Sequence, residues 1–214
     1  VETPDFIDRA WYFVGAPFAN YGFDVIKFHS STDDAVVSLF NHSTAQWRDD
    51  YTAIYAETVA AGEGFMVWPF TAAKAYEPVV FTNRGNYSLN NSDVTVTKTL
   101  PEGNEGNEGN DRWMALANPY TFKLNIATFL GNNQAKIQGN GVYIFNGTSF
   151  DLKETGEIKV TEGFFVNFTG NGEDAVNFNI TQRYAPSAKA NTEREFIELT
   201  LQNGNDKVRV YLAH

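Results

Sequence analysis

An internal repeat constrains the fold of this chain more than any other feature. Residues 11–18 match residues 113–120, with Trp11 aligned on Trp113 at an offset of 102. Four further blocks recur in the same order at offsets from 97 to 105: 24–28 with 125–129, 37–41 with 142–146, 63–67 with 162–166, and 79–81 with 176–178. This period is far longer than the ~20–50 residues of solenoid repeats. The pattern predicts a tandem duplication, in which each copy folds alone or two copies complete one pseudo-symmetric sandwich.

Each copy has the composition of short strands separated by tight turns. The 214 residues include 22 Asn and 17 Gly, which tolerate the positive φ of turns, but only 7 Pro. Runs of β-branched and aromatic residues lie between the turns, at 36–40, 65–68, 94–97, 142–145 and 164–168. The clearest hairpin is expected near the end, where 196–201 and 208–212 flank an Asn-Gly turn. These features predict an all-β fold of duplicated β-sandwich or jelly-roll-like units.

Few helices are expected, and each is short. Residues 125–130 form one candidate, with Asn125 as N-cap and Gly131 as the C-terminal stop. Residues 24–29 form the other, with Asp24 as N-cap.

The repeat boundaries predict four segments. These are a first β repeat over 1–100, a Gly/Asn/Glu linker over 101–111, a second β repeat over 112–185, and a terminal hairpin over 186–214 that starts a further β unit. The linker contains Glu-Gly-Asn three times, a composition typical of a flexible, solvated segment. Because the chain opens at Val1 without a start Met, we expect both ends to continue in a longer protein.

Composition argues against several classes of partner. The chain has 26 acidic and 16 basic residues and a net charge of −10, which disfavours nucleic acid and anionic membrane surfaces. No apolar run approaches the ~20 residues of a spanning helix, so membrane insertion is not expected. The chain has no cysteine, which excludes disulfides, thiolate metal sites and a cysteine nucleophile.

The sequence points to no catalytic, cofactor or metal site. The three histidines, His29, His42 and His214, lack ligand partners at the spacing of a metal site. Two acidic pairs, at 33–34 and 49–50, are read as solvated turns, although calcium binding there stays open. The Gly62-Glu63-Gly64 sequence lacks the lysine of a phosphate loop and is read as a turn into a buried strand.

The second copy also resembles a known kind of repeat. It carries Trp113-Met-Ala-Leu-Ala-Asn-Pro-Tyr120, then Gly141-Val-Tyr-Ile-Phe-Asn146, then Glu162-Gly-Phe-Phe-Val166. This order resembles the β-rich repeats of secreted and cell-surface Bacteroidetes proteins, which lie upstream of type IX secretion sorting domains. The resemblance covers residues 11–180 and implies an extracellular or cell-surface location.

Aromatic residues matched in both copies, such as Trp11, Trp47 and Trp113, are expected to build the core, and those present in only one copy are the candidates for binding. Trp68 is matched by Asn167, and it lies near Phe70 and Tyr76 in sequence. Flat aromatic rings on a β surface suit stacking against sugar rings or partner side chains. The interpretation that competes with binding, and that the sequence favours, is that Trp68 covers an edge or the contact between the copies.

The expected function is therefore binding and not catalysis. We expect a non-catalytic adhesion or scaffold module of a larger protein, with neighbouring β domains of the same chain as possible partners. The alternative is a carbohydrate-binding module that targets an attached enzyme to a polysaccharide surface. An exposed aromatic platform would favour the alternative, and a charged, Asn-rich surface would favour the scaffold.

Overall fold

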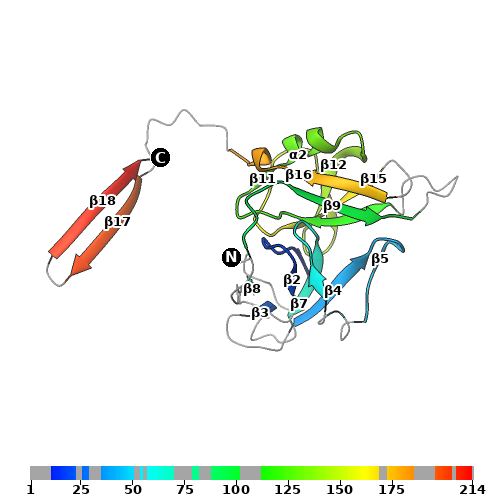
Figure 1. The fold of residues 1–214 in the computed structure, drawn as a ribbon, viewed down its shortest axis with the longest axis horizontal. Helices are drawn as coiled ribbons and strands as arrows, with labels where there is room; N and C mark the ends of the chain where they lie inside the picture. Colours follow the sequence, from blue (N-terminus) through cyan, green and yellow to red (C-terminus); the bar gives the residue numbers. More distant parts are fainter. Residues whose placement is uncertain are drawn as a thin grey trace. The chain divides into compact units, whose positions relative to one another are not determined.

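The computed structural model describes residues 11–22, 26–28, 35–50, 54, 57–69, 79–81, 88–101, 112–168, 173–185, 196–203 and 206–213. The chain has two compact units, Val1–Tyr184 and Ala185–His214. Both sequence repeats belong to the first unit. Antiparallel sheets make up most of the described structure (Figure 1), so the expected all-β class is confirmed.

Each repeat contains one four-stranded antiparallel sheet. The first sheet has the order β1-β7-β4-β5, and the second has the order β10-β15-β12-β13. The strands of the first sheet are β1 (Tyr12–Val14), β4 (Ala35–Asn41), β5 (Gln46–Trp47) and β7 (Phe65–Pro69). Those of the second are β10 (Trp113–Ala117), β12 (Ile137–Phe145), β13 (Phe150–Lys153) and β15 (Gly163–Phe168). The two sheets therefore have the same connectivity.

The pairing register is also the same in the two sheets. Val14 lies opposite Phe65 in the first, and the aligned residues Leu116 and Phe164 lie opposite each other in the second. Phe40 likewise pairs with Trp47 as Phe145 pairs with Phe150. Because a slip of one residue would move every side chain to the opposite face, the shared register places aligned residues in equivalent positions.

Smaller ladders complete the first unit. They join β2 (Tyr21–Gly22) to β6 (Thr58–Val59), β11 (Leu124–Asn125) to β14 (Glu157–Ile158), β3 (Ile26–Phe28) to β8 (Val79–Phe81), and β9 (Val94–Thr99) to β16 (Glu173–Phe178). Strand β9 lies at the end of the first copy in sequence but pairs with a strand of the second. The two copies thus share a sheet as well as a boundary.

The two helix predictions have different outcomes. Helix α2 (Ile126–Asn133) begins where expected, and the side chain of Asn125 caps it by accepting from the Thr128 amide at 2.9 Å. The predicted stop at Gly131 is wrong. The helix continues because the buried Asn133 exchanges two hydrogen bonds with the backbone of Asn177, at 3.0 and 2.9 Å.

The helix predicted over 24–29 is wrong wherever that segment is described. Ile26–Phe28 form strand β3, which pairs with β8 along its whole length. A capping residue alone is a weak signal, and a helix of six residues has little stability of its own. The ladder with β8 therefore decides the local structure. A single-turn helix, η3 (Ile180–Gln182), follows β16.

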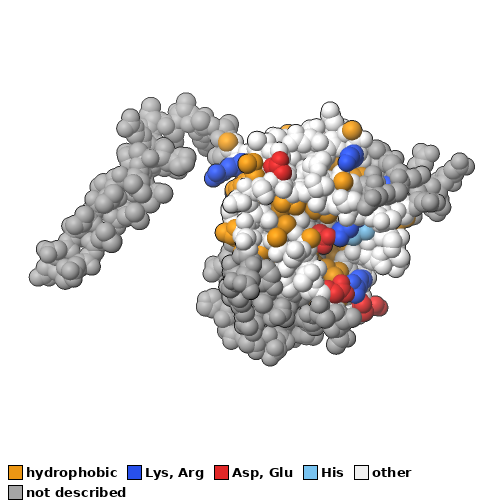
Figure 2. Space-filling model, viewed as in Figure 1, with side chains coloured by type: hydrophobic (Ala, Val, Ile, Leu, Met, Phe, Trp, Pro, Cys, Tyr) orange, Lys and Arg blue, Asp and Glu red, His pale blue; other side chains and the backbone are white. Residues whose placement is uncertain are grey.

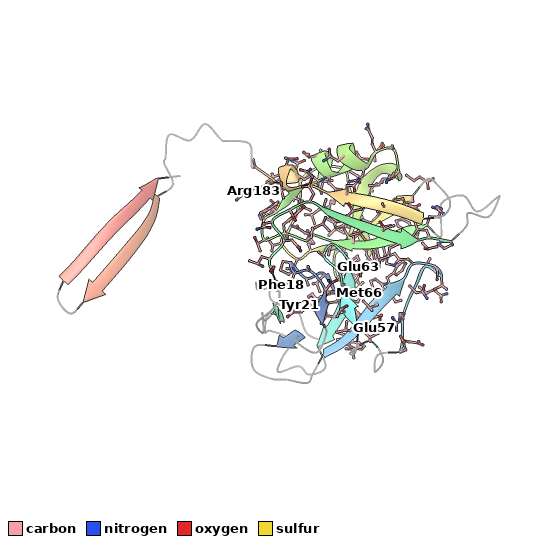
Figure 3. All side chains as sticks on the ribbon, in the orientation of Figure 1. Phe18, Tyr21, Glu57, Glu63, Met66 and Arg183 are labelled. Carbon is pink, nitrogen blue, oxygen red and sulfur yellow. The ribbon has the colours of Figure 1, made fainter. Side chains whose placement is uncertain are left out.

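Each four-stranded sheet packs on an apolar core, and Val96 and Leu100 of the first repeat join the core of the second. In the first, Phe18 and Tyr21 are buried and stack with ring centroids 5.3 Å apart (Figure 3). In the second, the fully buried Phe164 packs between Phe129 of α2 and Phe178 of β16. A third cluster lies where the two repeats meet, and its buried members are Phe13, Met66, Ala115 and Phe165.

The repeats meet through reciprocal backbone hydrogen bonds, in which aligned residues of the two copies exchange roles as in a pseudo-twofold pair. Gly15 N donates to Thr161 O, and the aligned Ala117 N donates to Gly62 O, both at 2.9 Å. Gly62 and Thr161 both have positive φ, at 86° and 61°. Two residues that are aligned in the repeat thus hold the same strained backbone position at the contact.

The Glu-Gly-Phe motif of each copy builds this contact. Glu63 and Glu162 each accept, through their side chains, the amide three residues earlier, at 3.3 and 2.7 Å. Added Cβ atoms on Gly64 and Gly163 would lie 2.6 Å and 2.5 Å from the ring of Phe13. The motif therefore turns the chain and admits a close approach of the two repeats.

The second unit contains the expected terminal hairpin. Strand β17 (Phe196–Asn203) pairs with β18 (Asp206–Ala213) in an antiparallel ladder that runs from Phe196 opposite Ala213 to Asn203 opposite Asp206. The predicted strands 196–201 and 208–212 are both confirmed within it.

Candidate functional site

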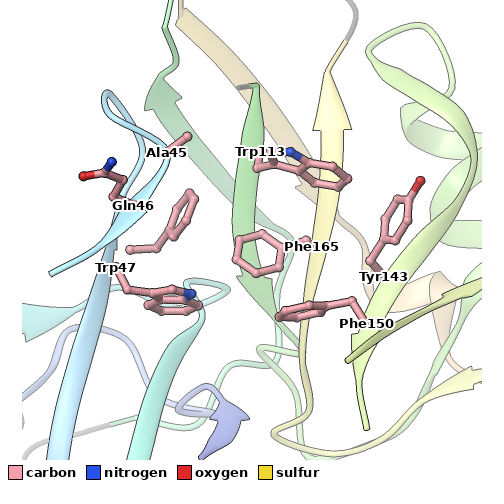
Figure 4. Close-up of a pocket in the computed structure, with 8 residues that line it drawn as sticks. Ala45, Gln46, Trp47, Trp113, Tyr143, Phe150 and Phe165 are labelled. Carbon is pink, nitrogen blue, oxygen red and sulfur yellow. The ribbon is translucent and has the colours of Figure 1, made fainter. Parts of the chain in front are cut away.

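An aromatic cleft lies over the contact between the two repeats. It has a volume of about 760 Å³, and Figure 4 shows side chains of both repeats around it. The first repeat supplies its wall from β4, β5 and the turn between them, and the second from β10, β12, β13 and β15. The lining residues are Phe40, Ala45, Gln46, Trp47, Trp113, Tyr143, Phe150 and Phe165.

Phe165 forms the floor of the cleft. It is buried, and its ring lies 4.9 Å from that of Phe40, 5.2 Å from Phe150 and 5.8 Å from Trp47 between centroids. These contacts have interplanar angles of 68–69°, close to the edge-to-face geometry that aromatic rings prefer. The packing fixes the rings, so the cleft is preformed.

The rim of the cleft is open to solvent. Phe150 is 38% exposed, while Trp47, Trp113 and Tyr143 are half-buried. Tyr143 stands almost perpendicular to Trp113, with centroids 4.9 Å apart. The Tyr143 hydroxyl is a polar group at the edge of the cleft, whereas the Gln46 amide points away from the aromatic rings (Figure 4). None of the eight lining residues carries a charge at neutral pH, so the wall favours a neutral ligand with flat apolar faces.

A second hollow, the polar pocket, shares Phe40 with the cleft. Its volume is about 570 Å³, and its 14 lining residues are Asn20 and residues from β4 to Arg48, the segment around β6, residues 63–64 and the end of β9. Arg48, Glu57, Glu63 and Lys98 carry its charges. Figure 3 labels Glu57 and Glu63, and Figure 2 shows acidic and basic side chains lying next to each other on the face viewed.

The charges of the polar pocket are paired. Arg48 donates to both oxygens of Asp50 at 2.8 and 2.6 Å and to both oxygens of Glu57 at 2.9 and 2.7 Å. These hydrogen bonds raise the pKa of Arg48 above its ordinary value and lower that of Asp50. Lys98 forms an ion pair with Glu63.

His42 joins the polar pocket to the second repeat. Its Nε2 accepts the amide of Ala115 in β10 at 3.2 Å, an interaction that the neutral ring makes. Burial lowers the pKa of His42 to about 4, and the positive charge of Lys98 acts in the same direction. The imidazole is therefore uncharged at neutral pH.

The structure separates Trp68 from the cleft. Trp68 is 37% exposed, but it does not line the cleft and instead packs against Trp11, with centroids 5.2 Å apart. Phe70 and Tyr76, the other two predicted ligand contacts, lie outside the described residues, as do His29, His214 and the 33–34 acidic pair. The predicted three-residue platform therefore stays a prediction.

Sequence reasoning missed the cleft. Trp47 and Trp113 have aromatic counterparts in the other copy and were expected to build the core, whereas the structure leaves both half-buried on the cleft wall. One signal was present in the alignment: Tyr143 and Phe165 stand where the first copy has Ser38 and Met66. These two substitutions add two aromatic rings to the wall that the second repeat contributes to the cleft.

The described residues include no group of three or more His, Asp or Glu placed to hold a metal ion. They also contain no helix with the length and apolar character needed to cross a membrane.

Comparison with protein-family models, with curated proteins and with solved structures gave no match to this chain.

Proposed function

We propose that the chain is a non-catalytic module that attaches a larger protein to a polysaccharide through the aromatic cleft. The observation that carries the proposal is the cleft itself, in which both repeats present half-buried aromatic rings around an uncharged hollow. A sugar ring has apolar C–H faces and polar edges. Aromatic faces beside the Tyr143 hydroxyl match both features.

The same observations favour the carbohydrate-binding alternative over a general scaffold. The discriminating feature named from the sequence was an exposed aromatic platform, and Phe150 and the half-buried rings around it have that character. An extracellular or cell-surface location, in the manner of the Bacteroidetes repeats that the sequence resembles, is part of the proposal. It would bring the module into contact with external polysaccharides.

Affinity electrophoresis through gels containing single polysaccharides tests the proposal with the full chain. The panel includes neutral xylan, mannan and mixed-linkage glucan, and anionic alginate and polygalacturonate. We expect at least one neutral polysaccharide to retard the chain. If none of the five polysaccharides in the panel retards the chain, the proposal is contradicted.

The repeat itself supplies variants that keep the fold. Tyr143→Ser introduces the residue of the aligned position, Ser38, and Trp47→Phe introduces that of Phe150. We expect Tyr143→Ser to weaken binding about tenfold and Trp47→Phe by less, because key aromatic contacts contribute more than ~1 kcal/mol each. Trp68→Ala is the matched control, which should bind as the parent does. If Trp68→Ala alone lost binding, the binding site would be the aromatic platform predicted around Trp68 and not the cleft.

A protein ligand is the competing outcome. An apolar cleft of this size also accepts side chains of another protein, as the adhesion or scaffold hypothesis requires. In that case the polysaccharide gels would leave the chain unretarded, and the carbohydrate proposal would fall.

A further inference from the structure

The polar pocket differs from the aromatic cleft in what it offers a ligand. Asn41, Thr58 and Thr99 bring amide and hydroxyl groups to its wall, next to the ion pairs of Arg48 and Lys98. These are the groups that donate to and accept from hydroxyls. The pocket is therefore suited to a ligand with many neutral hydroxyl groups.

The charge balance of the pocket disfavours an anionic ligand. Each lining cation is held by at least one carboxylate, and Asp50 adds a further negative charge beside Arg48. His42 adds no positive charge, because the Nε2 of its half-buried ring accepts the Ala115 amide and the ring is neutral. A uronate or sulfate group entering the pocket would have to displace Glu57 or Glu63 from an existing ion pair. A neutral hydroxyl needs no such exchange.

The ion pairs also make the pocket rigid. The guanidinium of Arg48 is held by four hydrogen bonds of 2.6–2.9 Å to two carboxylates. Side chains fixed before binding lose little conformational entropy when the ligand arrives. Preorganised donors and acceptors of this kind raise the affinity for a small polar group.

We propose that the polar pocket is a second sugar subsite, specific for an uncharged unit of the polysaccharide that the cleft binds. The inference rests on the proposed function. Phe40 borders both hollows, so the two subsites adjoin each other within one compact unit. Two linked sites on one body bind a polymer with a higher effective concentration than either site alone. The second subsite thus sets the preference for neutral over acidic polysaccharides.

The test uses two isosteric substitutions on the pocket wall. Thr58 and Thr99 are exposed residues of strands β6 and β9, and valine is a favourable strand residue. The double variant Thr58→Val/Thr99→Val removes two hydroxyls and keeps every ion pair. Thr97→Val is the control, because Thr97 is exposed on the same strand but does not line the pocket.

Calorimetric titration with oligosaccharides from the retarding polysaccharide gives the readout. We expect the double variant to raise Kd about five- to tenfold and Thr97→Val to leave it unchanged. Unchanged Kd in the double variant, together with weakened binding in Tyr143→Ser, would overturn the second subsite and leave the proposed function standing. Tighter binding of an acidic than of a neutral oligosaccharide would also overturn it. Weakening in neither the double variant nor Tyr143→Ser would overturn both.

Discussion

Phe164 lies fully buried between helix α2 and strand β16, with ring centroids 5.3 Å from Phe129 and 6.3 Å from Phe178. We predict that Phe164→Ala lowers the free energy of unfolding by ~3–5 kcal/mol, because it removes a buried ring and leaves a cavity. Urea denaturation measures the change. Leu152→Ala, at a position 49% exposed, is the control and should cost less than ~1 kcal/mol. A similar small loss for Phe164→Ala would place that ring outside the core.

His42 makes the stability of the fold depend on pH. The unfolded chain takes up the proton near pH 6.5, whereas burial lowers the pKa in the folded chain to about 4. The contribution is therefore fully present above pH 6.5 and is lost as the pH falls from 6.5 to about 4. Protonation also ends the role of Nε2 as acceptor for Ala115.

The size of this effect can be measured by difference. We predict that the chain loses roughly 3 kcal/mol of stability across this pH window through His42. In His42→Gln the side-chain oxygen can still accept the Ala115 amide, but it does not titrate. The free energy of unfolding is measured by urea denaturation of the parent chain and of His42→Gln from pH 7 to pH 4. The carboxylates titrate in both proteins, so the difference between the two curves gives the contribution of His42. Parallel curves would show that His42 titrates normally in the folded chain.

Among the elements, two glycines with different surroundings test the contact between the repeats. A Cβ on Gly64 would lie 2.5 Å from the Leu116 carbonyl oxygen, whereas a Cβ on Gly131 in helix α2 would have no atom within 4 Å. We predict that Gly64→Ala costs ~1–3 kcal/mol through overpacking and that Gly131→Ala stabilises the chain by ~0.5–1 kcal/mol. Thermal unfolding of both variants gives the comparison. A harmless Gly64→Ala would mean that the repeats do not approach each other this closely.

The β17–β18 hairpin is the element with the least support of its own. Among the described residues of its unit, each strand pairs only with the other, and an isolated two-stranded hairpin is marginal in water. We predict that its amides exchange with solvent faster than those at the centre of β15, which pairs on both edges. Hydrogen exchange followed by NMR gives both sets of rates. Equal protection would show that a further strand or partner covers the hairpin.

The accuracy of the sequence predictions varied from element to element. Ordered repeats and runs of β-branched and aromatic residues predicted β4, β7, β15 and the second half of β12, because each of these segments carries its own signal. The helix prediction over 24–29 was wrong because Ile26–Phe28 pair with β8, which lies more than 50 residues away in sequence. The predicted end of α2 at Gly131 was wrong for the same reason, since Asn133 forms hydrogen bonds with the distant residue Asn177.

At the scale of the whole first unit, the aromatic cleft exists only because two aligned surfaces meet. The repeat argument assigned matched aromatics to packing, and Phe65 and Phe164 fit that assignment. Trp47 and Trp113 do not, because the pseudo-twofold contact turns part of each sheet into a wall of a shared hollow. Which face of a repeated strand is covered depends on the other repeat, and no single copy carries that information.

The four tryptophans allow a direct test of the cleft as the binding site. Their indole N–H groups give separate NMR signals, and Trp47 and Trp113 line the cleft while Trp11 and Trp68 pack against each other outside it. In a titration of the ¹⁵N-labelled chain with a binding oligosaccharide, we predict that the signals of Trp47 and Trp113 move and those of Trp11 and Trp68 do not. Movement of the Trp68 signal with those of Trp47 and Trp113 unchanged would contradict the account.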